Sequence, residues 1–92
     1  MSHMDVDDVK TVRRRAFGRA ISELRRNRRI SQERLALLAE IDRSYVGQIE
    51  RGEKSPTLDK IWQLSDALHV TPVEIFTQVL VEQQTLEDGH PS

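Results

Sequence analysis

Apolar residues recur along this chain at the spacing of one helix face. Near the N-terminus seven of them fall three, four, seven or eight residues apart, with arginines on the opposite side. This period predicts an α-helix with one buried stripe, whose start Asp7 or Asp8 can cap. The stripe comprises Val9, Val12, Ala16, Phe17, Ala20, Ile21 and Leu24. No stretch alternates with period two, so the pattern predicts helices and no sheet.

Capping residues divide the rest of the chain into four shorter helices. The predicted N-caps are Ser31, Asp42, Thr57 and Thr71. Thr71-Pro72-Val73-Glu74 is a capping box with proline at the first helical position, the clearest start signal in the sequence. The apolar residues that follow the other caps include Leu35, Leu38 and Ala39, then Val46 and Ile49, then Leu58, Ile61, Leu64, Ala67 and Leu68. We therefore expect one all-α domain of five helices over residues 8–86. Residues 1–7 are interpreted as a tag remnant and flexible N-terminus, and residues 87–92 as a disordered tail.

Composition removes several kinds of function. The chain has 92 residues, a net charge of −1 and no cysteine, which excludes a disulfide scaffold, a thiol nucleophile and a cysteine zinc site. No apolar run is long enough to cross a bilayer, so a soluble cytoplasmic protein is expected. The net charge conceals a strong polarity, because residues 10–34 hold ten bases against two acids and residues 55–92 hold six acids against one base. A basic front can face phosphates although the total is near zero.

Two short helices separated by three or four residues, Ser31 to Ala39 and Asp42 to Arg51, form a helix-turn-helix pattern. The inward positions are Leu35, Ala39, Ile41, Val46 and Ile49, with the small Ala36 where the two helices cross. From about Phe17 to Phe76 the chain resembles the XRE family of bacterial and phage regulators, which includes the lambda Cro and repressor domains. The stretch from Asp42 to Gly52 looks most like short stand-alone regulators such as restriction-modification controller proteins. The resemblance implies a five-helix lambda-repressor-like fold with the motif at helices 2 and 3.

In such a fold the second helix of the motif lies in the major groove and the first crosses the backbone. We expect Arg43 to read guanine and Gln48 to read adenine, with Ser44 less selective and Gly47 allowing close approach. Gln32 should contact a phosphate at the start of the first helix of the motif. Arg51 and Lys54 should contact phosphates on the other flank of the phosphate path. The candidate DNA-binding residues are thus Gln32, Arg43, Ser44, Gly47, Gln48, Arg51 and Lys54. Tyr45 has two open roles, against sugar and phosphate or above the core.

The resemblance also assigns a structural ion pair. Arg25 matches the family position that pairs with a glutamate on the recognition helix, here Glu50, and this pair would fix one helix against another. Arg29 and Glu40 occupy turn positions where the family often has glycine, so left-handed backbone is expected there. Arg13, Arg14, Arg15 and Arg19 are expected to steer DNA at long range and not to touch it.

The last helix carries two apolar stripes, which suggests an assembly. Val73, Phe76 and Leu80 form one stripe, and Ile75, Val79 and Leu86 form the other. A helix that lines one small core needs only one apolar stripe, and a second exposed stripe would be unfavourable in a monomer. We therefore expect an isologous homodimer through residues 73–86. The predicted interface residues are Ile75, Val79, Leu80 and Leu86.

Three classes of function compete. The leading one is a transcriptional regulator that binds a near-palindromic operator in double-stranded DNA as a homodimer, as a restriction-modification controller does. The second is an antitoxin that also regulates its own operon, and the third is an interaction module that keeps the motif only as a scaffold. RNA polymerase or a toxin protein would be the further partner. No catalytic site is expected, because no nucleophile, base and orienting group cluster on a predicted surface, and no cofactor is expected. No metal site is expected, because His3, His69 and His90 lack a second ligand at helical spacing.

Overall fold

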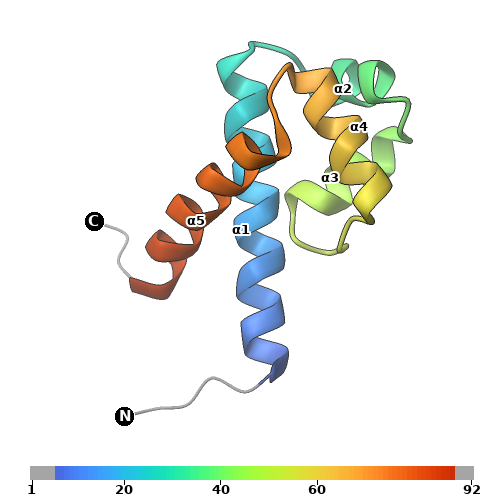
Figure 1. Ribbon diagram of the computed structural model, residues 1–92. Helices are drawn as coiled ribbons and strands as arrows, with labels where there is room; N and C mark the ends of the chain where they lie inside the picture. Colours follow the sequence, from blue (N-terminus) through green and yellow to red (C-terminus); the bar gives the residue numbers. More distant parts are fainter. Residues whose placement is uncertain (1–5, 89–92) are drawn as a thin grey trace.

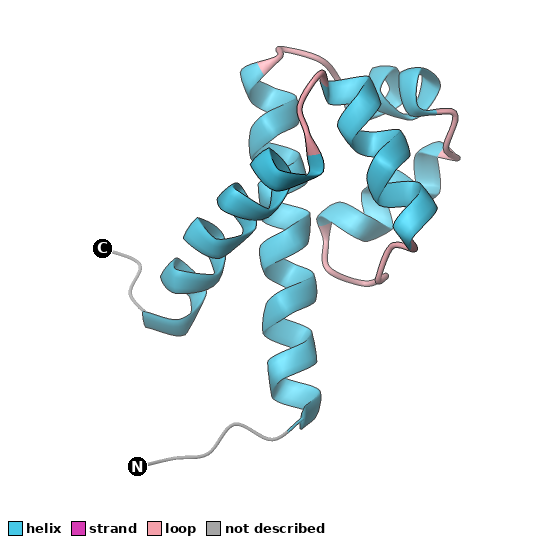
Figure 2. Ribbon diagram, in the orientation of Figure 1, coloured by secondary structure: helices cyan, strands magenta, loops and turns pink. Residues whose placement is uncertain are grey.

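The computed structural model describes residues 6–88, and this part of the chain forms five α-helices and no strand (Figures 1 and 2). The helices are α1 (Val6–Asn27), α2 (Gln32–Ala39), α3 (Arg43–Glu50), α4 (Leu58–Leu68) and α5 (Pro72–Asp88). The long α1 is the central element, with α5 packed along it and α3 crossing it on the other side (Figure 1). The expected all-α fold with the motif at α2 and α3 is confirmed. Among residues 6–88, no helix combines the length and apolar character that spanning a membrane requires.

The helix starts follow the capping residues read from the sequence. The Ser31 hydroxyl accepts a hydrogen bond from the backbone N–H of Arg34 at 3.0 Å, and the Thr57 hydroxyl accepts one from Lys60 at 3.2 Å. Thr71 and Glu74 bond each other's backbone N–H reciprocally, each at 3.1 Å, which completes the capping box. These bonds satisfy backbone donors that have no partner inside the helix.

The N-cap of α3 differs from the other three caps because its side chain makes no capping hydrogen bond. Asp42 lies at the N-cap position with extended backbone, but its side chain makes no capping bond. Its carboxylate instead accepts a hydrogen bond from the Ser44 hydroxyl at 3.1 Å. The start of α3 was therefore placed correctly, although the bond expected to fix it is absent.

Both ends of the domain extend further than the sequence suggested. The helix α1 begins at Val6, so the prediction of Asp7 or Asp8 as its cap is wrong, and both residues lie inside the first turns. At the other end α5 continues to Asp88 because Leu86 is half-buried against the core, so residues 87 and 88 are not tail. The expectations for residues 1–5 and 89–92 lie outside the described residues.

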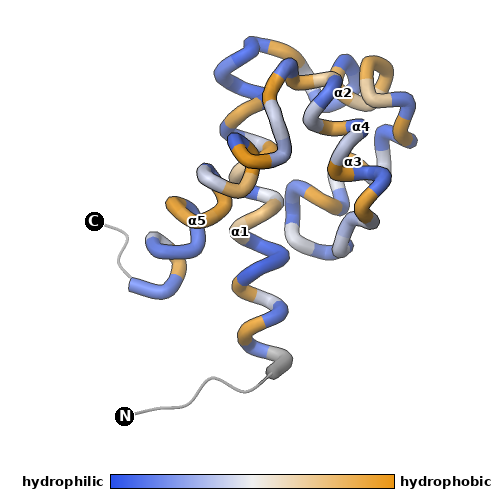
Figure 3. The backbone as a smooth tube through the Cα atoms, in the orientation of Figure 1, coloured by the Kyte–Doolittle hydropathy of each residue, from blue (hydrophilic) through white to orange (hydrophobic). Residues whose placement is uncertain are grey.

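The core is built by one face of each helix, and hydrophobic and hydrophilic residues alternate along the tube accordingly (Figure 3). Its largest fully buried side chains are Ile21, Leu35, Val46, Ile49, Leu64, Leu68 and Ile75. Leu38 and Leu58, which continue the apolar pattern of their helices, are 44% and 68% exposed.

The two stripes of α5 have the opposite roles to those predicted. Ile75 and Val79 are buried in the protomer's own core, and Leu86 is half-buried against it. The prediction of Ile75 and Val79 as dimer-interface residues is therefore wrong, because both are buried within the protomer, where α5 packs on α1 and α4. The stripe left in solvent contains Val73, Phe76 and Leu80, of which only Leu80 was in the predicted interface.

Within residues 6–88, three residues other than glycine have left-handed backbone. Arg29 and Glu40 have φ of 59° and 58°, as the turn positions suggested. His69, with φ of 58°, ends α4 in the same way and was not predicted. At each of these positions glycine would adopt the conformation without the steric cost of a Cβ atom.

Candidate nucleic-acid interface

The helix α3 is held by its apolar face and presents its N-terminus to solvent. Val46 and Ile49 are buried, and Ile41 in the preceding turn is 7% exposed. With that face fixed, Arg43 and Ser44 lie exposed in the first turn of α3, and Gln48 lies half-buried one turn later. An exposed arginine at the start of a helix that protrudes from the domain can reach the edges of base pairs.

Gly47 is buried, which contradicts the expectation that it lies open on the groove-facing side. The guanidinium of Arg51 folds back over it, so that a methyl group added to Gly47 would lie 3.1 Å from Nη1 of Arg51. The covering group is the flexible end of a side chain. DNA could therefore reach Gly47 only when Arg51 moves.

Arg51 is held in this position by Glu53. Its Nε donates to Oε2 of Glu53 at 2.7 Å, and Nη2 donates to Oε1 at 3.2 Å. These hydrogen bonds raise the pKa of Arg51 and lower the pKa of Glu53 below its ordinary value of 4.5. The pair is therefore fully formed above that value, and it is lost only as the pH falls through the lowered pKa of Glu53. Both side chains are more than half exposed, so a phosphate can compete for Arg51.

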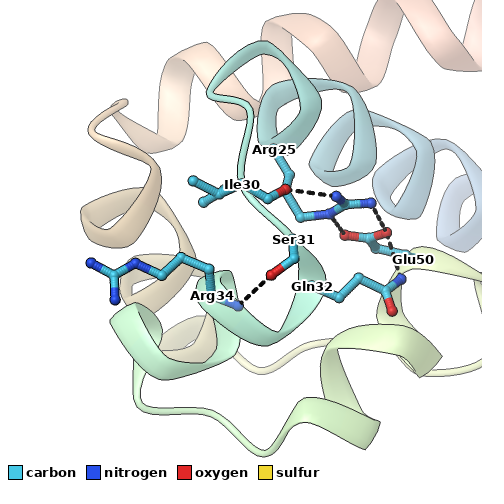
Figure 4. Close-up of polar contacts among 6 residues, drawn as sticks. All are labelled: Arg25, Ile30, Ser31, Gln32, Arg34 and Glu50. Carbon is cyan, nitrogen blue, oxygen red and sulfur yellow. Dashed lines mark hydrogen bonds and ion pairs between the residues drawn. The ribbon is translucent and has the colours of Figure 1, made fainter.

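Behind α3 lies a network centred on Glu50 (Figure 4). Arg25 of α1 donates to both carboxylate oxygens of Glu50, at 2.7 and 3.0 Å, and also to the main-chain oxygen of Ile30 at 2.9 Å. The hydrogen bonds with Glu50 raise the pKa of Arg25. The side chains of Arg25 and Glu50 are 13% and 6% exposed. The structure thus contains the ion pair that the family resemblance implied, and it joins α1 to the end of α3.

Gln32 is part of the same network. Its amide nitrogen donates to Oε1 of Glu50 at 2.9 Å, which ties the first residue of α2 to the last residue of α3. One of the two donors of its side-chain nitrogen is therefore occupied. A phosphate at this helix start would meet the backbone N–H groups of the first turn and the positive end of the helix dipole.

Close packing of α1 on α3 depends on Gly18. A methyl group at this position would overlap the main-chain oxygen of Ile49 and would lie 2.6 Å from that of Glu50. The two helix backbones approach so closely that no side chain fits between them. The apolar pattern does not reveal this contact, and its only signal in the sequence is a glycine within the arginine-rich α1.

Contacts in the structure indicate the roles of Tyr45 and Arg28. Tyr45 packs half-buried against the core with Nζ of Lys60 5.9 Å from its ring centre, which favours the role above the core. Arg28, within the basic run that ends α1, donates to the main-chain oxygen of His69 at 3.1 Å. This arginine therefore links two turns. Lys54, in the loop after α3, is exposed as expected.

An apolar groove borders the exposed stripe of α5. It has a volume of about 340 Å³, and Phe17, Ile61 and Phe76 are among the residues that line it, together with Leu80. The rings of Phe17 and Phe76 lie 5.7 Å apart between their centres. Phe76 is 43% exposed and Leu80 is 65% exposed, so apolar surface continues from the groove onto α5.

Comparison with known proteins gives a consistent picture. The helix-turn-helix family model HTH_3 matches residues 21–75. The control protein C.BamHI of Bacillus amyloliquefaciens is 37% identical over 60 residues, covering 64% of this chain and 74% of the relative. The crystal structure of the restriction-modification controller protein C.AhdI from Aeromonas hydrophila is 44% identical with a TM-score of 0.68, covering 68% of this chain and 96% of that one. The controller protein C.Esp1396I, as a tetramer in complex with its natural 35 base-pair operator, is 25% identical with a TM-score of 0.73, covering 78% and 95%.

Proposed function

This chain belongs to the helix-turn-helix family HTH_3, and from that membership we propose that it is a sequence-specific transcriptional regulator of the restriction-modification controller type. The observation that carries the proposal is the N-terminus of α3, where Arg43 and Ser44 are exposed on a helix fixed from behind by the Arg25–Glu50 pair. A helix presented in this way can enter the major groove of B-DNA.

In this proposal Arg43 is the main base reader. Its guanidinium has no hydrogen bond to any described residue and can make a bidentate contact with O6 and N7 of guanine. Ser44 is held near Asp42 by its hydroxyl and adds a less selective contact. Gln48, half-buried one turn later, can pair with adenine if its amide swings outward.

Phosphates are proposed to lie on both flanks of the groove. On one side the start of α2 at Gln32 offers backbone N–H groups and a favourable dipole. On the other side Lys54 and Arg51 follow α3, and Arg51 would exchange Glu53 for a phosphate. Such contacts fix the register of the protein on the duplex without reading sequence.

The active form is proposed to be a symmetric homodimer through the exposed stripe of α5. Val73, Phe76 and Leu80 form apolar surface beside an apolar groove of the same protomer, so a second copy could place its stripe against that groove. An isologous contact buries the same patch on both copies. Two recognition helices spaced by about 34 Å would then read a near-palindromic operator one helical turn apart.

Selection of binding sites from random duplex DNA tests the recognition step. We expect wild-type protein to enrich a near-palindrome, and Arg43→Ala to lose the preference for guanine at one position of each half-site. The matched variant Arg43→Lys keeps the charge but not the planar fork, so it should retain general affinity and lose about 1–3 kcal/mol of discrimination. Enrichment of no sequence by the wild-type protein would contradict the proposed function.

Sedimentation tests the assembly separately. Leu80→Glu should shift the protein from dimer to monomer at micromolar concentration, because it places a charge in the proposed apolar contact. Leu37→Glu is the matched control, since Leu37 is 68% exposed on α2, away from the stripe. A dimer that persists in Leu80→Glu would show that another surface forms it.

A further inference from the structure

A second basic feature lies on the outer face of α1, away from the core. A cleft of about 450 Å³ runs between α1, the end of α3 and the C-terminal half of α5. Four arginines line it, of which Arg15, Arg19 and Arg26 belong to α1 and Arg51 follows α3. We name this feature the arginine cleft.

The α1 arginines form one straight row. Arg15, Arg19 and Arg26 are separated by four and seven positions, so they share one helix face, with Ser22 between the last two. At a rise of about 1.5 Å per residue the row is roughly 16 Å long. Cations spread along a line suit a linear polyanion better than a single small anion, which needs donors that converge on one point.

The acids of the cleft leave much of this positive charge free. Glu50 is bonded to Arg25 and Gln32, and Glu82 accepts from Arg19 at 3.2 Å. Glu23 is the third acid of the lining. Among residues 6–88, the guanidinium groups of Arg15 and Arg26 take part in no hydrogen bond or ion pair, and both residues are exposed. Two guanidinium groups in the cleft are thus available to a ligand.

The cleft is continuous with the face of the recognition helix. The guanidinium of Arg51 covers Gly47 on α3 and also lines the cleft. The loop after α3 packs directly on the row, since a methyl group at Gly52 would lie 2.9 Å from Cγ of Arg15. A DNA strand leaving the groove occupied by α3 would therefore meet Arg51 first and the row on α1 next.

We infer that the arginine cleft binds backbone phosphates of the same DNA duplex that α3 reads, and so lengthens the protein's footprint on one strand. This inference rests on the proposed function. It replaces the expectation that Arg15 and Arg19 only steer DNA at long range. Guanidinium groups bind phosphate through paired N–H donors, so direct contact adds affinity without adding sequence preference.

The test is the salt dependence of DNA binding by the double variant Arg15→Gln/Arg26→Gln. Each phosphate contact contributes about 0.9 to the slope of log K against log salt concentration, so the slope should fall by about 1.8 for each bound protomer and by about 3.6 for a bound dimer. Over a fourfold rise in salt, the variant should then lose about 12-fold less affinity than the wild type for each bound protomer. The selected operator sequence should not change. Because neither side chain has a partner in the described structure, the melting temperature should also stay the same.

A control variant and a second ligand separate the outcomes. Lys10→Gln/Arg29→Gln removes the same charge from exposed residues outside the cleft, and its slope should change by well under one contact. If Arg15→Gln/Arg26→Gln binds operator with the wild-type slope, the inference is wrong while the proposed function stands. If that variant keeps the wild-type slope but no longer binds inorganic pyrophosphate in calorimetry, the cleft is a small-anion site and the inference is wrong. If the wild-type protein selects no operator, the proposed function itself fails.

Discussion

Glu50 is the carboxylate at which three helices meet, and its replacement by glutamine should destabilise the domain strongly. It ends α3, and it accepts hydrogen bonds from Arg25 of α1 and Gln32 of α2. Glutamine has nearly the same shape but carries no charge, and its amide group offers two donors in place of one acceptor oxygen. One N–H of Arg25 would then face another donor. The guanidinium would keep its charge without a counter-ion.

The expected loss follows from the burial of the pair. Removing one partner of a buried ion pair costs about 3–5 kcal/mol. The side chain of Glu50 is 6% exposed and that of Arg25 is 13% exposed, so some solvent still reaches the guanidinium. We therefore expect a decrease in the free energy of unfolding near the lower end, about 3 kcal/mol. For a domain of this size, at about 4–8 °C for each kcal/mol, the melting temperature should fall by roughly 12–24 °C.

Urea unfolding followed by far-UV circular dichroism measures this difference directly. Glu53→Gln is the matched control, because Glu53 also pairs with an arginine but is 51% exposed, and its unfolding midpoint should not change measurably. The double variant Arg25→Met/Glu50→Met should be more stable than Glu50→Gln, since it leaves no unpaired buried charge. A loss below about 1 kcal/mol in Glu50→Gln, or a double variant as unstable as the two single changes combined, would refute the reasoning.

Three further changes give distinct results. Gly18→Ala should destabilise the domain sharply in thermal melts because its methyl group would overlap the backbone of α3, whereas Gly47→Ala meets only the movable end of a side chain and should be mild; equal effects would contradict the close packing of α1 on α3. Glu40→Gly should stabilise by up to about 1 kcal/mol, because the left-handed conformation no longer opposes a Cβ atom, and a lower unfolding midpoint would argue against strain there. Glu53→Gln should tighten DNA binding at neutral pH, since it releases Arg51 for a phosphate; unchanged affinity in a titration at fixed salt would show that Arg51 makes no such contact.

The helices and the recognition motif could be predicted from the sequence because their signals are local. Ser31, Thr57 and the Thr71–Glu74 capping box bond to backbone groups within three residues, so no distant contact is needed to place them. The wedge of Leu35, Val46 and Ile49 is likewise visible as apolar spacing and is buried as expected. The left-handed turns at Arg29 and Glu40 match positions where the family often has glycine, whereas nothing in the sequence indicated the one at His69.

The tertiary structure decided what depends on neighbours distant in sequence. The two stripes of α5 are both apolar, and only the packing of α1 determines that Ile75 and Val79 are covered while Val73 and Leu80 are not. The tertiary structure also decided which charges are paired. The sequence shows a basic segment, but it does not show which of its arginines form ion pairs. Arg25 is ion-paired with Glu50, whereas the guanidinium of Arg15 is unpaired among the described residues and lines a cleft between α1, α3 and α5. Local patterns fix which face of a helix can be buried, but only the folded chain fixes what lies opposite that face.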